Sequence, residues 1–176
     1  SLSTASPVLI PTSSGAPSQT TEVDLRMNLP AADAPITVAF DPTDPLTYNN
    51  STSVTIFDSL GDSHIMTYYF IKEDPAVATN SWLVYTAVDG VMLDIDGGVS
   101  SIANPTHDAA IPGSLANIRG AQLTFTTGGD FDAQNPALIS TQDFTSNILT
   151  NGAGTQDITI DFNLDDAGPN PNEPTQ

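Results

Sequence analysis

The chain has 176 residues, a length typical of one domain, and its 3 Lys and Arg residues oppose 21 Asp and Glu residues, for a formal net charge of −18. This charge excludes nucleic acid as a partner, because phosphate groups must be neutralised by Lys and Arg. It disfavours anionic membrane surfaces for the same reason. The absence of Cys excludes disulfides, thiolate zinc sites and cysteine nucleophiles.

The two ends of the sequence differ in composition from its middle. Residues 1–20 are rich in Ser, Thr and Pro, which predicts an extended connector. Residues 165–176 contain Pro, Asn and Gly and are predicted to form a disordered tail. Residues 21–164 are expected to form the folded domain. No apolar run approaches the ~20 residues of a membrane-spanning helix, and no basic and then apolar leader opens the chain.

The middle of the chain alternates between apolar and polar residues with the period of two that is typical of half-buried strands. The predicted strands are 21–29, 36–40, 53–57, 64–71, 81–88, 121–126 and 155–162. Loops are expected at 40–50 and at 94–119, the second with one short helical turn near 115–118. About seven to nine short strands and frequent Pro and Gly favour an all-β fold, a single antiparallel β-sandwich or β-barrel-like domain with long loops.

The strongest local prediction is a hairpin formed by the strands 53–57 and 64–71. Its turn, 58–62, contains Gly61, which can adopt a positive φ and form a bulge. The return strand carries large apolar groups on both faces, so we expect a central strand with structure packed on each side. In the strand 81–88, alternation places Trp82 and Leu83 on opposite faces, and Trp82 is predicted to anchor the core.

The two histidines give little support for catalysis. His64 follows a turn at the start of a strand, and we expect it to hydrogen-bond turn residues at the rim of the sheet. His107 precedes Asp108, but a catalytic triad is built from residues adjacent in space rather than in sequence, and no G-x-S-x-G motif accompanies it. We therefore assign no catalytic residue and predict that the chain is not an enzyme.

The acidic residues provide two weak candidates for a cation site. The segment 94–97 reads D-I-D-G, but a calcium loop that began at Asp94 would have Gly98 and Pro105 at its fifth and twelfth positions, where ligands are required. A second group lies near the end of the chain: Asp161, Asp165 and Asp166. Solvated acidic loops are expected for both groups, so no metal site and no cofactor is assigned.

Aromatic side chains are concentrated in two of the predicted strands. They are Tyr68, Tyr69, Phe70, Trp82 and Tyr85. Such residues can line a carbohydrate-binding groove, but core and cross-strand packing is their more frequent use. A calcium-dependent adhesin or a carbohydrate-binding extracellular β-sandwich is therefore the alternative to a purely structural domain.

Several segments match known sequence patterns in order and in approximate spacing. The segment SVTIFDSLGDSH (53–64) is similar to the pattern S-V-T-V-[FY]-D-S-x-G-N-x-H, and it continues into TYYFIK (67–72) and WLVYT (82–86). Further matching segments are VDLRMNL (23–29), QLTFTTGG (122–129) and ITIDF (158–162). Together they resemble the bacterial flagellar hook protein family. Asp62 departs from the usual Asn of the pattern, and the segment 89–120 does not align.

The resemblance implies a structural subunit domain of the flagellar hook, the joint that links motor and filament. It implies an outer domain that contacts neighbouring subunits, an extracellular location in the flagellum, and export without a cleaved signal peptide. The expected partners are other copies in the full-length polymer. The helical inner domains of this family need heptad patterns that the sequence lacks. The isolated chain is therefore expected to be monomeric. A rod subunit is a related alternative.

Overall fold

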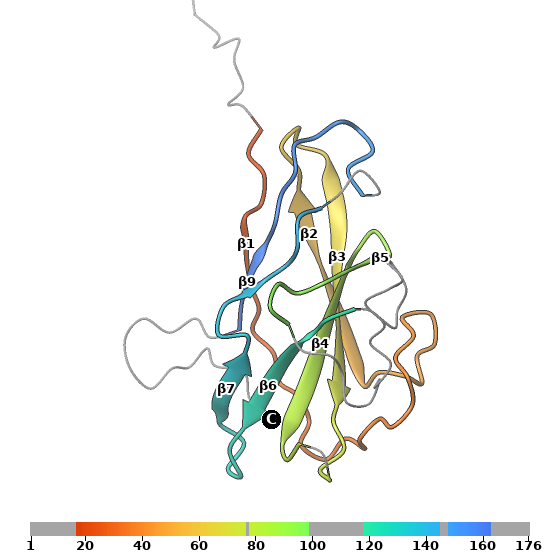
Figure 1. Cartoon of the computed structure of the whole chain (residues 1–176), viewed down its shortest axis with the longest axis vertical. Helices are drawn as coiled ribbons and strands as arrows, with labels where there is room; N and C mark the ends of the chain where they lie inside the picture. The colour runs from red at the N-terminus through yellow and green to blue at the C-terminus, as the bar shows by residue number, and fades with distance from the viewer. Residues whose placement is uncertain (1–16, 77, 99–117, 145–147, 163–176) are drawn as a thin grey trace, which may run out of the picture.

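The computed structural model describes residues 17–76, 78–98, 118–144 and 148–162, and every regular element in these ranges is a β-strand. The strands are β1 Glu22–Asp24, β2 Asn50–Phe57, β3 Ser63–Lys72, β4 Ser81–Val88, β5 Val91–Leu93, β6 Ala121–Phe125, β7 Phe131–Asn135, β8 Ile139–Ser140 and β9 Thr159–Asp161 (Figure 1). Within the same ranges, no helix has the length and hydropathy needed to span a membrane.

The strands form two sheets. The larger sheet has the order β2-β3-β4-β6-β7, and β5 pairs with β4 as well. The smaller sheet has the order β1-β9-β8. All pairs are antiparallel except β1 with β9, which is parallel. The prediction of an all-β, antiparallel sandwich is thus confirmed, and the one parallel pair among the described strands joins the two strands nearest the ends of the domain.

The predicted hairpin is confirmed, including its turn. The Gly61 N–H donates to the Asp58 carbonyl, and the Asp58 N–H donates to the Asp62 carbonyl. Gly61 and Asp62 therefore both lie opposite Asp58, which is the arrangement of a bulge with glycine in its first position. Gly61 has a φ of 88°, a conformation that other residues adopt at a cost.

Two predicted strands are shorter than expected, and one is absent. In the segment 21–29 only β1 forms a strand, although Leu25 and Leu29 are buried as the alternation predicted. In 155–162 only β9 does, although Ile158 and Phe162 are buried. The segment 36–40 forms no strand at all. Apolar alternation reports which side chains face a core, and a chain can bury alternate side chains without a ladder partner.

Three short strands were not expected from the sequence. β5 follows a turn in which Asp89 and Gly90 have φ values of 49° and 80°, and it has only three residues. β8 has two residues, and β7 is largely exposed and lacks apolar alternation. Such strands carry too little periodic signal to be recognised. His107, Asp108 and most of the expected helical turn lie outside the described residues; Ile118, at the end of that turn, is not helical.

The main core lies between the two sheets. Alternate residues of β3 and β4 face it from the larger sheet, and residues of β1, β8 and β9 face it from the smaller one. Its largest fully buried members are Trp82, Tyr68, Phe144, Phe162, Leu29, Ile56, Met66, Ile95 and Leu123. The exposed fraction of Trp82 is 0%, so its predicted role as a core anchor is confirmed.

A second, smaller core covers the opposite face of β3 and β4. Leu83 and Tyr85 point into it from β4, as the alternation predicted. The ring of Phe40 stacks on Tyr85 with the centroids 4.8 Å apart and the planes at 6°. Tyr48 packs edge-on against Tyr69 at 5.1 Å. Residues 40–49 form a loop, as expected, whereas Asn50 already belongs to β2, and the loop contributes two aromatic side chains to this core.

The loop contact gives a test of the second core. Replacing Phe40, which is 5% exposed, by Ala is expected to lower the free energy of unfolding by about 3–5 kcal/mol, because a buried aromatic side chain is lost. Val38→Ala is the matched control, since Val38 is exposed and its truncation should change stability by less than about 0.5 kcal/mol. Urea unfolding measures both; equal effects would mean that the loop does not pack on the sheet.

Candidate functional site

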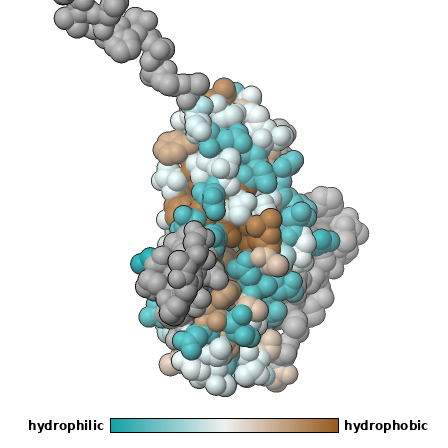
Figure 2. All heavy atoms as spheres, turned by 90° about the vertical axis from the view of Figure 1, so that its left-hand side faces the viewer, coloured by the Kyte–Doolittle hydropathy of each residue, from teal (hydrophilic) through white to brown (hydrophobic). Residues whose placement is uncertain are grey.

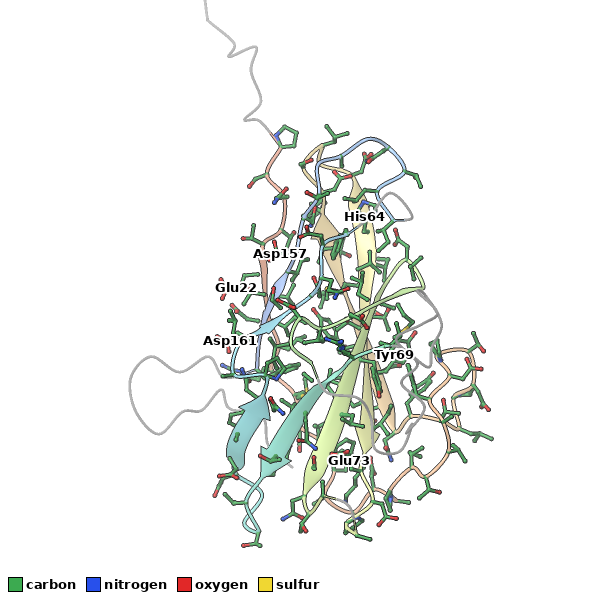
Figure 3. The ribbon with its side chains drawn as sticks, viewed as in Figure 1. Glu22, His64, Tyr69, Glu73, Asp157 and Asp161 are labelled. Atoms are coloured by element: carbon green, nitrogen blue, oxygen red, sulfur yellow. The ribbon has the colours of Figure 1, made fainter. Side chains whose placement is uncertain are left out.

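A histidine between two carboxylates lies at the end of the β2–β3 hairpin. His64, labelled in Figure 3, is the second residue of β3. Asp58 belongs to the preceding turn, and Asp89 belongs to the turn between β4 and β5. The Nδ1 atom of His64 is 2.7 Å from Asp89 Oδ2, and its Nε2 atom is 3.3 Å from Asp58 Oδ2. His64 thus contacts turn residues at the sheet rim, as its position in the sequence predicted.

Asp58 is the centre of this network and is fully buried. Its Oδ1 accepts hydrogen bonds from the backbone N–H groups of Leu60 and Asp62, at 2.8 and 2.9 Å. The side-chain amide of Asn151 donates to Oδ2 of Asp58 and to Oδ2 of Asp62, at 2.6 Å each. Asn151 lies in the segment that leads to β9, so the network joins loops of both sheets.

The protonation states follow from these contacts. The hydrogen bond from Asn151 is the largest influence on Asp58, and against the opposing effect of burial it helps to lower the pKa to about 2. Burial alone would lower the pKa of His64, but hydrogen bonds and attraction from Asp89 and Asp58 outweigh it and raise the pKa. Burial would raise the pKa of Asp89; the Ile65 N–H and His64 outweigh it and lower that pKa.

This arrangement is suited to holding loops together rather than to catalysis. Both ring nitrogens of His64 face carboxylates, so neither is available to remove a proton from a substrate. When the imidazole of His64 is protonated, its positive charge compensates part of the negative charge of Asp58 and Asp89. We call these three residues with Asn151 the hairpin clasp.

A second buried carboxylate, which sequence reasoning missed, lies near the other end of the larger sheet. The exposed fraction of Glu73 is 2%, and its Oε2 accepts hydrogen bonds from the hydroxyl of Ser81 and, at 2.6 Å, from the amide of Gln122. The contacts join the end of β3 to β4 and β6. In the sequence, Glu73 follows Lys72, and two adjacent residues of opposite charge are typical of an exposed segment. No local pattern therefore predicts the burial of Glu73.

One group of carboxylates could hold a metal ion. One oxygen from each of Glu22, Asp24 and Asp161 lies within 4.8 Å of the others, and Asp24 is directly opposite Asp161 in the parallel pair (Figure 3). The sequence indicated Asp161 but grouped it with Asp165 and Asp166, which lie outside the described residues. Only the pairing of β1 with β9 brings Glu22 and Asp24 to it.

The geometry does not provide a carbohydrate-binding platform on the aromatic residues named above. All of them except Tyr69 are buried, and Tyr69 packs against Phe40 and Tyr48. An open groove of about 510 Å³ exists elsewhere, and the residues that line it are of polar or acidic type: Asp96, Ser140, Thr141, Gln142, Asp143 and Asp157. Asp94, the other carboxylate of the D-I-D-G segment, accepts a hydrogen bond from the Arg119 N–H at 2.7 Å. A calcium loop starting at Asp94 remains excluded by its sequence.

The hairpin clasp predicts a pH dependence of stability. Because the folded-state pKa of His64 is raised above 6.5, its contribution is complete below pH 6.5 and is lost as pH rises through the folded pKa. The pKa values of Asp58 and Asp89 are lowered from 3.8, so their contribution is lost as pH falls below 3.8. The clasp should therefore stabilise the fold most between about pH 4 and 6.5.

Urea unfolding at a series of pH values checks this prediction. The difference in unfolding free energy between the wild type and His64→Gln should be larger near about pH 5 than near about pH 9. A difference that does not change with pH would show that His64 is not charged in the folded state.

Comparisons with known proteins agree with the sequence patterns. Residues 11–176 match the family model described as the flagellar basal body protein FlaE D2 domain. The flagellar hook protein FlgE of Escherichia coli (strain K12) is 30% identical over 111 residues, which cover 62% of this chain and 27% of that protein. The hook proteins FlgE of Salmonella typhimurium and Salmonella typhi are each 36% identical over 81 residues, 46% of this chain and 19% of theirs. The matched region is a minor part of each relative.

Proposed function

The chain belongs to the family of the flagellar basal body protein FlaE D2 domain, and on this premise we propose that it is an outer, structural domain of a flagellar hook subunit. The observation that carries the proposal is the match of nearly the whole chain, residues 11–176, to that family model. The relatives named above are hook proteins, which favours a hook subunit over a rod subunit.

The roles of the residues that resemble the family pattern support a structural function. Asp58, Gly61 and His64 form the turn and the clasp, and Phe70 and Trp82 are buried in the main core. None of these side chains presents a reactive group to solvent. The residues of the pattern therefore have structural roles, and the function that we propose for the domain is mechanical.

In the proposed hook, this domain forms part of the outer surface of the tube and touches copies of itself along rows. Contacts that shift as a joint bends must be small and polar. The surface suits this requirement, because polar and apolar residues are interspersed on the face that Figure 2 presents. The charge of −18 makes copies repel, with a screening length of about 8 Å at physiological salt. The bending stiffness of the hook is therefore expected to change with salt concentration.

The division of the chain follows the same proposal. Residues 1–20 connect the domain to the rest of the subunit, residues 21–164 form the outer domain, and residues 165–176 form a tail. Of these, residues 1–16, 77, 99–117, 145–147 and 163–176 lie outside the described residues. The location is extracellular, in the flagellar hook, and the subunit is exported without a cleaved signal peptide.

Sedimentation of two proteins tests the proposed function. The 176-residue chain alone should sediment as a monomer, because its charge opposes association. The chain with both flanking ends of its gene restored should assemble into tubes visible by electron microscopy. A stable oligomer of the chain alone, or no assembly after the ends are restored, would count against a hook subunit.

A calcium titration separates the proposal from the adhesin alternative, which the family match and the relatives do not support. At a calcium concentration a hundred times its Kd for calcium, the folded state of an adhesin would gain about 2.7 kcal/mol of stability. Its Tm would rise by several degrees. We expect the Tm in calcium to equal the Tm in chelator. Asp24→Asn is the control, because any rise that depends on the Glu22, Asp24 and Asp161 group should disappear in this variant.

A further inference from the structure

The larger sheet has two open edges. β2 pairs only with β3, and β7 pairs only with β6, among the strands of the described ranges. In the lower half of Figure 1 the strands run from β7 on the left to β2 on the right. An open edge presents unpaired backbone N–H and C=O groups, and these can pair with another chain.

The hydrogen-bond pattern identifies the outward groups of β2. The Asp58 N–H donates to the Asp62 carbonyl. Residues that bond to the partner strand alternate along an antiparallel strand, so the even-numbered residues of β2 bond to β3. The residues between them, Ser51, Ser53 and Thr55, therefore point their N–H and C=O groups away from the sheet. The next such residue, Phe57, supports this assignment, because its carbonyl accepts from the Thr20 N–H at 2.9 Å. The upper end of this edge thus already binds an extended segment.

The composition of β2 leaves its edge unprotected. Its eight residues, NSTSVTIF, include no charged residue and no Pro, although the chain as a whole carries a charge of −18. Natural edge strands normally avoid pairing through charges, Pro, bulges or a covering segment. A second copy of the chain, which is equally acidic, can approach the stretch 51–55 without meeting a carboxylate on the strand. Beyond the lower end of this stretch, the side-chain amide of Asn50 donates a hydrogen bond to the Asp33 carboxylate.

The outward groups of β7 follow from the same reasoning. The Phe125 N–H donates to the Asn80 carbonyl, so odd-numbered residues of β6 bond to β4 and even-numbered ones bond to β7. Gln122 and Thr124 pair with Asn135 and Ala133, and Gln134 between them points its backbone groups outward. A register shift leaves Asp132 without a partner in β6, and Asp132 carries the only charge of this strand.

We propose that β2 of one copy pairs with β7 of the next copy, so that the larger sheet continues from subunit to subunit. This inference rests on the proposed hook function. Successive strands in the order β2-β3-β4-β6-β7 are antiparallel, so β2 and β7 run in the same direction. A neighbouring copy that is rotated to follow the twist of the sheet, without being turned end over end, therefore forms a parallel pair at the junction.

The geometry of such a junction fits a row of identical subunits. Pairing between two different edges is head to tail, and it generates an open row instead of a closed dimer. Pairing of β2 with β2 would need a two-fold axis, which copies in one orientation along a tube do not have. The short stretches 51–55 and 132–134 leave room for only a few hydrogen bonds. The parallel pairing is also slightly less stable per residue than antiparallel pairing, so the contact can open and re-form.

Amide hydrogen exchange of the 176-residue chain, followed by NMR at rising protein concentration and at high salt, tests the contact. High salt screens the repulsion between copies. The amides of Ser51, Ser53 and Thr55 should become protected together with that of Gln134, while association stays too weak to populate a stable oligomer at low concentration and low salt. Protection confined to β2, or no protection at either edge, would overturn the proposal.

Paired substitutions isolate the backbone contribution. Ser53→Pro removes the outward N–H, whereas Ser53→Ala keeps it; both lose the side-chain hydrogen bond of Ser53 to Thr67. On the other edge, Gln134→Pro and Gln134→Ala form the same comparison, since both lose the side-chain bond to the Ala137 carbonyl. Each Pro variant should weaken association at least tenfold relative to its Ala partner. Equal association constants for the two members of a pair would contradict the pairing.

The folding of each variant is checked by its urea midpoint. If a Pro variant unfolds, Thr55→Glu replaces it, because Glu keeps every backbone donor but places a negative charge on the edge; a charge there should still weaken association. The test is also separable from the proposed function. If the wild-type chain with its flanking ends does not form tubes, the hook function fails. If wild type and Ser53→Pro form tubes of equal stability, only the edge pairing fails.

Discussion

Strand β4 is buried along its whole length, and this constraint organises the rest of the domain. One face of β4 fills the main core with Trp82 and Val84, while the other fills the second core with Leu83 and Tyr85. A strand in this position needs a cover on each side. The smaller sheet covers one face, and the loop that carries Phe40 and Tyr48 covers part of the other.

Local periodicity predicted the parts of the fold in which a strand and its partner are close in the sequence. The hairpin around Gly61 and the strand that contains Trp82 have strong alternation and short connections, so their bounds came close to those observed. Pairing between distant segments was not predictable in this way. Val23 signalled a buried strand, but nothing near it in the sequence indicated that its partner would be Ile160 or that the pair would be parallel.

The electrostatic features show the same difference between partners that are close in the sequence and partners that are distant. The position of His64 next to a turn predicted its contacts with turn residues, because Asp58 is only six positions away. The contribution of Asn151 was not predictable, since it comes from a distant loop and is defined only by the packing of the two sheets. The same holds for the burial of Glu73. In an acidic chain, the local sequence does not indicate which carboxylates are buried. Only tertiary packing distinguishes the buried carboxylates from the solvated ones.

The parallel pairing of β1 with β9 has a mechanical consequence. The chain enters β1 at Glu22, beside Thr159, and leaves β9 at Asp161, beside Asp24, so the segment that enters the pair and the segment that leaves it do so at opposite ends. Tension between these segments acts along the strands and across the hydrogen bonds that join them, including Thr159 N–H to Thr21 O and Leu25 N–H to Asp161 O. Those bonds share the load in shear instead of opening one after another. A domain held by its two ends in this way resists stretching as a unit.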